Sequence, residues 1–312
     1  MERKKVLVGF SGNPEYVFAG INMRDFLDNK KSLAHDYHEG VGGTSVNVVR
    51  SLILLEAPVF TKLLVSVSDK EEDDMRNNLL RKLTRLDLEY HPLQAMVHTN
   101  LAFTLIFDNE VTKLPGLKSK YLHLPIDEIG DQVESFQPDI CIASGVVPWE
   151  IPLAKTLFGN GSENILNPRK ECFEDREQIL PLLRLTNMLV LNESELLIFN
   201  TTASQDWRKA SSFDPIFELG PSEVIITCGK NGSYYGNHDG FHHHQPAIVN
   251  DKVVDYTGIG DCYLGGFLTK RLEGASIEDC MRFAAAVASM KVELVTGSNV
   301  PRRKDVEQLL AS

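Results

Sequence analysis

Apolar residues along the chain gather in two kinds of run, short β-rich segments and longer segments at helical spacing. The strand-like runs are Val6–Phe10, Phe60–Val67, Ile140–Ser144, Asn164–Asn167, Met188–Leu191 and Val224–Thr227. The helical runs include Thr44–Leu55, Asp69–Leu86, Trp149–Leu157, Arg176–Leu185 and Glu193–Phe199. Strands that alternate with helices are typical of a mainly parallel sheet covered by helices on both faces. The pattern therefore predicts an α/β fold whose ligands bind beyond the carboxyl ends of the strands.

Two regions interrupt this alternation. Residues 15–38 are polar and irregular, and Thr99–Phe107 is a long β-like run that ends in an Asp108-Asn109 turn, with residues 111–124 after it. Both regions are compatible with a small accessory sheet that stands off the main domain, and equally with plain surface loops. The spacing of the residues does not decide between the two.

The composition narrows the function classes. The chain has 312 residues, enough for one large α/β domain with an appendage or for two domains. Its formal net charge is −11, from 43 acidic and 32 basic residues. A general nucleic-acid binder would be basic, so this charge argues against a nucleic-acid partner. It fits an enzyme that acts on small metabolites.

The cysteines and the apolar runs bear on the compartment. Five cysteines are dispersed along the chain without a C-x-x-C pair, which is typical of reduced thiols in a cytosolic protein. The apolar run in the first ten residues is too short for a signal peptide, and no run reaches the length of a membrane span. We therefore expect a cytoplasmic protein without a membrane partner.

The most informative stretch is a glycine turn near the C-terminus. The β-branched pair Val253-Val254 leads into a turn with Gly258 and Gly260, and a helical pattern begins at Asp261. The free N–H groups and the dipole of such a helix start favour an anion, and glycines let the main chain approach a phosphate closely. A carboxylate among these donors can accept the proton of a hydroxyl that attacks a phosphoryl group.

Two other interpretations of the turn compete. One is half of a dinucleotide fingerprint, but the third glycine, Gly265, comes too late for G-x-G-x-x-G. The other is a purely structural glycine turn capped by Asp261, which this stretch alone leaves open. A P-loop of the form G-x-x-x-x-G-K-[ST] does not occur in the sequence.

The stretch from Asp255 to Asp261 resembles the D-T-x-G-A-G-D signature of the ribokinase-like carbohydrate kinases, which include ribokinase, fructokinase and adenosine kinase. The resemblance implies that Asp261 is the catalytic base and that the turn Gly258, Ile259 and Gly260 is the anion hole. Two positions depart from the signature, because Tyr256 stands where Thr is usual and Ile259 replaces a small Ala or Ser. The hole is built from backbone, so Ile259 need not abolish it, although a bulky side chain can narrow the turn or change nucleotide affinity.

A second glycine pair opens the first long helix. The run Gly42-Gly43-Thr44-Ser45-Val46-Asn47 resembles the family's G-G-x-x-x-N sugar-binding motif. Upstream, Asn13 and Glu15 follow the first strand, where the family often has an Asp that binds sugar hydroxyls. The resemblance thus implies a substrate site formed by Gly42, Gly43, Asn47, Asn13 and Glu15, with Glu15 in place of Asp as a departure.

Three further motifs concern the nucleotide and its metal. Asn192-Glu193-Ser194-Glu195 resembles the family's N-x-x-E motif, in which the Glu helps to hold Mg²⁺ through water, and it also fits a helix capping box. The run from Thr227 to Gly232 resembles the T-x-G-x-x-G turn beside the nucleotide, so Asn192, Thr227, Gly229 and Gly232 are expected to bind it. Asn167-Pro168-Arg169 resembles an N-P-R segment of the family, and Arg169 is equally compatible with an ordinary surface position.

Together these similarities extend from residue 4 to about residue 301 and occur in the family's order. They imply one ribokinase-like domain over residues 1–312, with a central mostly parallel sheet, helices on both faces and a small β lid from about residues 11–40 and 95–125. ATP and Mg²⁺ are the implied cofactors. Many members of the family also place K⁺ or Na⁺ beside the anion hole, here near Asp255 and Thr257, and many dimerise through their lids.

The acceptor is described only by class. Thr44 stands where ribokinase-type sequences commonly have Lys, and Arg24 and Arg50 are isolated, so no basic cluster is available for an acceptor that already carries a phosphate. This favours an unphosphorylated sugar or a nucleoside. The departures at Tyr256 and Ile259 leave a second hypothesis, an inactive nucleotide- or sugar-binding relative with a sensor or regulatory role, against which the retained Asp261 argues.

Overall fold

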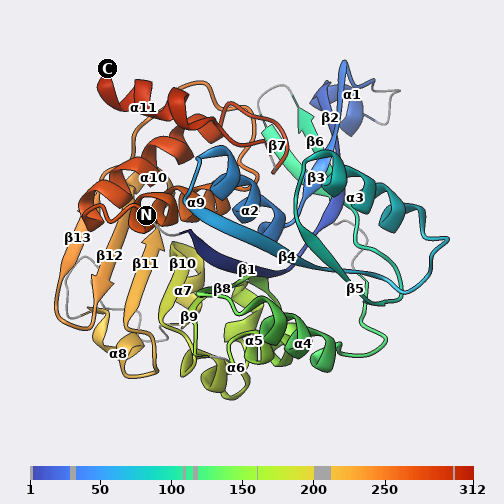
Figure 1. Ribbon diagram of the computed structural model, residues 1–312. Coiled ribbons are helices and arrows are strands. Elements are labelled where there is room, and N and C mark those ends of the chain that lie inside the picture. Colours follow the sequence, from blue (N-terminus) through green and yellow to red (C-terminus); the bar gives the residue numbers. More distant parts are fainter. Residues whose placement is uncertain are drawn as a thin grey trace.

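The structure is a computed structural model that describes residues 3–28, 33–107, 110–114, 119–159, 161–199, 212–297 and 299–312. Among these residues, thirteen strands form two separate sheets. Nine strands build the main sheet in the order β13-β12-β11-β10-β9-β8-β1-β4-β5, and four strands build a small sheet in the order β3-β2-β6-β7 (Figure 1). The turn predicted at Asp108-Asn109 lies outside the described residues.

The main sheet confirms the predicted α/β fold. Its strands are parallel from β5 to β11, and the antiparallel pairs are β11 with β12 and β12 with β13 at one edge. Each predicted strand is present within a few residues. The nine strands are β1 (Lys4–Phe10), β4 (Val59–Ser68), β5 (Tyr90–Met96), β8 (Ile140–Val146), β9 (Glu163–Pro168), β10 (Met188–Asn192), β11 (Glu223–Thr227), β12 (Ser233–Asn237) and β13 (His242–Gln245).

Helices cover both faces of this sheet (Figure 1). Because side chains alternate along a strand, Leu7 of β1 joins the core on one face while Val6 and Val8 join the core on the other. The first face is covered by α4 (Ile126–Phe136), α5 (Ile151–Leu157), α6 (Arg176–Leu183), α7 (Glu193–Phe199) and α8 (Asp214–Phe217). The second is covered by α2 (Thr44–Leu54), α3 (Asp74–Arg85), α9 (Ile259–Leu272) and α10 (Ile277–Lys291), and α11 (Arg303–Ala311) packs on α10.

The small sheet answers the alternative that the sequence left open, since both irregular regions contribute strands to it. It consists of β2 (Asn13–Ile21), β3 (Asp36–Gly42), β6 (Ala102–Phe107) and β7 (Glu110–Leu114), with the short helix α1 (Met23–Leu27) after β2. Its aromatic side chains contact one another on one face. Residues of the opposite face, Glu15 and Ala102, line a cavity of the main domain.

Two helices of the main domain bring distant segments of the chain together. A Cβ atom at Gly265 of α9 would lie only 2.2 Å from Cβ of Ser51 in α2, so the absence of a side chain there is what allows the two helices to approach. Both helices begin near the carboxyl ends of the parallel strands. Their N-terminal turns therefore meet at the edge of the sheet where ligands bind in α/β folds.

Candidate functional site

Asp261 lies in the first turn of α9, and only 6% of it is exposed. The side-chain amide of Asn47 in α2 donates a hydrogen bond of 2.7 Å from Nδ2 to Oδ2 of Asp261. The other end of that amide, Oδ1 of Asn47, is buried without a hydrogen-bond partner among the described residues. The two motifs that the sequence placed far apart thus meet in one contact, and a polar atom beside it is left unpaired.

The turn before Asp261 is open to solvent on one side. Gly258 caps α9 with a φ of 74°, a left-handed conformation that favours glycine, and no side chain caps this helix end. The first N–H groups of the helix consequently have no intrahelical acceptor. A Cβ atom at Gly260 would meet nothing within 4 Å, so the turn borders open space. These features suit a site for an anion.

Asp255 has a structural position just upstream. It is fully buried, its Oδ1 accepts from the backbone N–H of Thr257 at 2.8 Å, and its Oδ2 accepts from the N–H of Thr296 at 3.1 Å. The carboxylate therefore joins the glycine turn to the loop after α10. The hydroxyl oxygens of Thr257 and Thr296 are both buried and without a hydrogen-bond partner within the described part of the chain.

A cavity of about 490 Å³, here called the acceptor cavity, lies in front of Asp261. The five residues that the sequence assigned to substrate binding all line it, together with Asp261, Thr257 and Gly258: Asn13, Glu15, Gly42, Gly43 and Asn47. Glu15 is 3% exposed, and its Oε2 accepts a hydrogen bond of 2.9 Å from the backbone N–H of Gly297. The small sheet thus contributes one wall of the cavity, through Asn13 and Glu15 of β2.

A smaller cavity of about 210 Å³, the junction cavity, lies on the other side of Asp261 and Gly260. Glu195 lines it, and burial raises the pKa of this carboxyl to about 7. The N–H of Asn192 donates to Oε2 of Glu195, and the N–H of Glu195 donates to Oδ1 of Asn192. This reciprocal pair is the capping box that the sequence left as one of two interpretations. The capping box does not exclude the other interpretation, a role in holding Mg²⁺, because the carboxylate of Glu195 also lines the junction cavity.

Arg169 answers a question that the sequence left open. It lines both the acceptor cavity and the junction cavity, so it is not an ordinary surface arginine. Among the described residues that line these two cavities, Arg169 is the only basic one. Its neighbour Asn167 lines the junction cavity as well.

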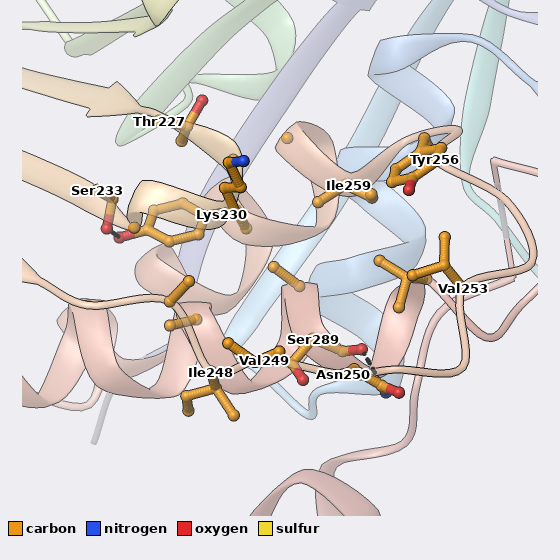
Figure 2. Close-up of a pocket in the computed structure, with 18 of the residues that line it drawn as sticks. Thr227, Lys230, Ser233, Ile248, Val249, Asn250, Val253, Tyr256, Ile259 and Ser289 are labelled. Atoms are coloured by element: carbon orange, nitrogen blue, oxygen red, sulfur yellow. Dashed lines mark hydrogen bonds between the residues drawn. The ribbon is translucent and has the colours of Figure 1, made fainter.

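A third cavity, also of about 490 Å³, lies beyond the glycine turn and is called the nucleotide cavity (Figure 2). Asn192, Thr227, Gly229 and Gly232, which the sequence assigned to nucleotide binding, all line it. Gly260 lines both this cavity and the junction cavity. The two departures from the family signature, Tyr256 and Ile259, line it too (Figure 2).

One polar cluster was missed by the sequence analysis. The hydroxyl of Tyr121 lies 2.7 Å from Oγ of Ser66 and donates to Oε1 of Glu150 at 3.0 Å. Ser66 and Glu150 line the acceptor cavity, and burial raises the pKa of Tyr121 well above its usual range. Nothing in the local sequence marks these three residues as neighbours. Glu150 also accepts a hydrogen bond from the N–H of Val147 and so caps a short turn before α5, a local role that the sequence could have indicated.

Two features are absent from the described ranges, a cluster of metal ligands and a membrane-spanning helix. Among the described residues, no three or more His, Cys, Asp and Glu residues come together as a metal site, and Glu195 and Asp261 are the carboxylates that line the junction cavity. Such a carboxylate is compatible with Mg²⁺, which keeps several waters and uses few protein ligands. None of the helices is both long and apolar enough to cross a membrane.

Known kinases resemble parts of the chain in sequence. Ribokinase of Arabidopsis thaliana is 34% identical over 132 residues, which cover 41% of this chain and 35% of that protein. Nucleoside kinase of Methanothermobacter thermautotrophicus is 41% identical over 85 residues, which cover 27% of this chain and 26% of that protein. The matches thus span about a third or less of the length of these two relatives.

Solved structures resemble the whole chain at lower identity. The nucleoside kinase of Methanocaldococcus jannaschii superposes with a TM-score of 0.75 at 23% identity, and 99% of each chain is covered. Ribokinase of Arabidopsis thaliana, in its complex with ribose and ATP, superposes with a TM-score of 0.73 at 20% identity over the full length of both chains. At these identities the likeness establishes the ribokinase-like fold. The profile of the pfkB family of carbohydrate kinases matches residues 14–303, and the chain therefore belongs to that family.

Proposed function

We propose that the protein is an ATP-dependent phosphotransferase that phosphorylates a hydroxyl of a small sugar or a nucleoside. The observation that carries this proposal is the position of the glycine turn. Asp261 lines the acceptor and junction cavities, and Gly260 lines the junction and nucleotide cavities. A hydroxyl in the first cavity and a triphosphate that extends from the third would therefore meet at Asp261.

In this mechanism Asp261 accepts the proton of the attacking hydroxyl. The hydrogen bond from Asn47 fixes the orientation of the carboxylate. The uncapped N–H groups of the turn Gly258, Ile259 and Gly260 stabilise the charge that spreads over the transferred phosphoryl oxygens. Arg169, at the border of the two cavities, adds a positive charge beside the same group.

Glu195 and Asn192 are the residues that would hold Mg²⁺ in the junction cavity, where the ion supplies charge neutralisation for the nucleotide phosphates. Asp255 and Thr257 would take part in a monovalent cation site. The buried hydroxyl oxygens of Thr257 and Thr296, which lack hydrogen-bond partners within the described residues, support that assignment because an unpaired buried oxygen is costly.

The charges of the acceptor cavity bear on the acceptor. Glu15, Glu150 and Asp261 contribute carboxylates to its lining, against the single guanidinium of Arg169. An acceptor that already carries a phosphate would be repelled by this surplus of negative charge. Asn13, Asn47 and Glu15 instead suit the hydroxyl groups of an uncharged sugar or nucleoside, since amides both donate and accept hydrogen bonds and carboxylates accept them.

The small sheet acts in this proposal as a lid that closes over the acceptor and excludes water, on a single kinase domain. Its outer face is also proposed to pair with a second copy of the chain. Tyr16, Phe18, Tyr37 and Phe103 contact one another there, and Tyr37 is 50% exposed. Light scattering after size exclusion tests the pairing, and a monomer of 34.9 kDa would contradict it.

The function is tested by a coupled assay of ADP release with Mg-ATP, K⁺ and a panel of pentoses, hexoses, sugar acids, sugar phosphates and nucleosides. We expect turnover with an uncharged member of the panel. In Asp261→Asn, which keeps the size of the side chain, we expect kcat to fall by about 10²–10⁴-fold because the proton acceptor is lost. Measurable ATP binding without turnover on any acceptor would instead favour an inactive binding protein, and turnover that Asp261→Asn leaves intact would contradict the assigned base.

A further inference from the structure

Exposed apolar side chains gather around the nucleotide cavity. The loop that connects β13 to α9 has no regular secondary structure, and it presents Val249 at 77% exposure, Val253 at 42% and Tyr256 at 64%. All three residues line the cavity. Single exposed apolar residues are ordinary on a protein surface, but a group of them around one cavity marks a binding site.

The inner walls of the cavity are apolar as well. Ile248 and Ile259 contribute branched side chains, and α10 contributes the small residues Ala285 and Ala288. In Figure 2 the side chains of Tyr256 and Ile259 lie above the loop that carries Val249 and Asn250. The ring of Tyr256, which is largely exposed, takes part in no aromatic contact among the described residues.

Two polar side chains of the same cavity, those of Asn250 and Ser233, are engaged within the protein, and Lys230 is another polar residue that lines it. Nδ2 of Asn250 donates to the carbonyl of Ser289 and to Oε1 of Glu293, and its Oδ1 accepts from the N–H of Lys252 (Figure 2). Oγ of Ser233 lies 2.7 Å from the hydroxyl of Tyr263. A base in this cavity would thus find apolar surface in abundance but few side-chain groups able to read its hydrogen-bonding edge.

We propose that Tyr256 is the platform on which the base of the phosphate donor stacks, and that the site consequently binds ATP and GTP with similar affinity. Stacking on an aromatic ring tolerates different bases because every base has a π face. The ring belongs to the same loop as the anion turn, only two residues before Gly258, so one short segment would hold both the base and the phosphates. The inference rests on the proposed function, which makes this cavity the donor site.

Equilibrium titration calorimetry with ATP and with GTP, without any acceptor, tests the proposal. We expect the two dissociation constants of the unchanged protein to agree within about fivefold. Tyr256→Phe keeps the ring and should bind both nucleotides as before, whereas Tyr256→Thr and Tyr256→Ala should weaken both by about tenfold or more. Phe60→Ala removes an aromatic ring of similar exposure, 52%, near the start of β4, and should change neither constant.

Unchanged affinity of Tyr256→Ala for ATP and GTP would contradict stacking on Tyr256. A preference of more than about a hundredfold for one of the two nucleotides would contradict a site that accepts either base. Once the panel provides an acceptor, Tyr256→Ala should raise the KM for ATP and leave kcat unchanged, because the ring contacts the base and not the reacting phosphate. A fall in kcat at unchanged KM overturns this role. Nucleotide binding without turnover on any acceptor would contradict the kinase function while leaving the stacking platform intact.

Discussion

The acceptor cavity and the nucleotide cavity enclose the same volume, about 490 Å³, yet they are built from opposite chemistry. The acceptor cavity has buried carboxylates that are fixed by hydrogen bonds, such as Glu15 to Gly297 and Asp261 to Asn47. The nucleotide cavity has apolar walls, and its most prominent aromatic side chain, Tyr256, is largely exposed. A reacting hydroxyl must be held at a defined place, whereas a base that takes no part in the reaction needs only a surface. The two cavities follow this difference.

A substitution at Glu15 should give the largest difference between the two cavities. Glu15→Gln removes the negative charge and weakens the hydrogen bond from Gly297 at one wall of the acceptor cavity only. We expect the KM for the acceptor to rise about tenfold or more, on the scale of a charged hydrogen bond, while the dissociation constant of ATP stays unchanged. Steady-state kinetics and calorimetry measure the two quantities separately.

Glu39→Gln is the matched control for Glu15. Glu39 lies opposite Tyr16 in the small sheet, one residue out of register with Glu15, so its side chain is on the other face. It bonds to Asn78 and Lys82 instead of lining the acceptor cavity. Equal effects of the two substitutions on the acceptor KM would refute a specific role for Glu15.

A smaller effect is expected from the monovalent cation, which would lie beside the glycine turn, near Asp255 and Thr257. Replacement of choline by K⁺ should raise the rate of phosphoryl transfer several-fold, because the ion would bind the buried, unpaired hydroxyl oxygens of Thr257 and Thr296. Thr257→Val removes one of these oxygens at nearly constant volume and should abolish the difference between the two salts. Equal reaction rates in K⁺ and in choline for the unchanged protein would contradict the proposed cation site.

The smallest effect concerns pH and Glu195, where the cavities join. Burial raises the pKa of this carboxyl from its ordinary value near 4.5 to about 7 in the folded protein. Glu195 therefore contributes stability that is fully present below about pH 4.5 and is lost as the pH rises through 7. Without nucleotide or metal, the unchanged protein should lose of order 1 kcal/mol over this range relative to Glu195→Gln in urea unfolding. Parallel pH profiles for the two proteins would contradict this.

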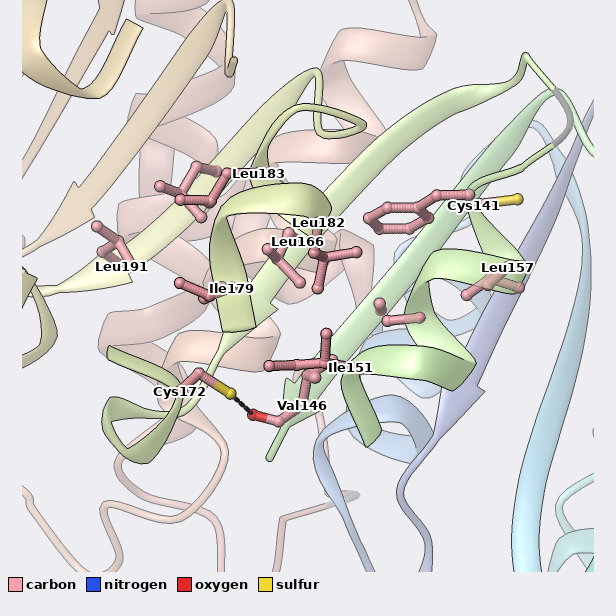
Figure 3. Close-up of a cluster of buried hydrophobic side chains, with 14 of the residues drawn as sticks. Cys141, Val146, Ile151, Leu157, Leu166, Cys172, Ile179, Leu182, Leu183 and Leu191 are labelled. Carbon is pink, nitrogen blue, oxygen red and sulfur yellow. Dashed lines mark hydrogen bonds between the residues drawn. The ribbon is translucent and has the colours of Figure 1, made fainter. Parts of the chain in front are cut away.

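The main sheet was predictable because its strands are buried on both faces and therefore read as continuous apolar runs. Figure 3 shows the result on one face, where Ile151 and Leu157 of α5 and Ile179 and Leu182 of α6 pack against the sheet. The small sheet was not predictable from the local pattern of residues, although the family resemblance implied a small β lid from about residues 11–40 and 95–125, and the four strands of the sheet lie within those ranges apart from the last two residues of β3. Its strand β2 carries the buried acid Glu15 among partly exposed residues, so its local pattern is irregular, and pairing with β3 and β6 decides its conformation.

The candidate site was predictable where a motif is local and not where it depends on tertiary contacts. The glycine turn and the residues around it could be assigned from one stretch of sequence. The hydrogen bond between Asn47 and Asp261 joins residues 214 positions apart, and no spacing rule predicts it. Arg169 and Glu150 likewise reach the acceptor cavity through the order of the strands and helices. The roles of all these residues remain predictions for the experiments above.

The hydrogen bond from Gly297 to Glu15 has a consequence for folding during synthesis on the ribosome. These two residues lie 282 positions apart, so Glu15 leaves the ribosome long before its partner is made. The nascent chain can pair β2 with β3 and later with β6. The carboxylate of Glu15 has no hydrogen bond from Gly297 until that residue has been synthesised, and Asp261 also emerges late. The acceptor cavity is thus among the last parts of the fold to be completed during synthesis, and under the proposed function a partly synthesised chain would not yet bind an acceptor beside Asp261.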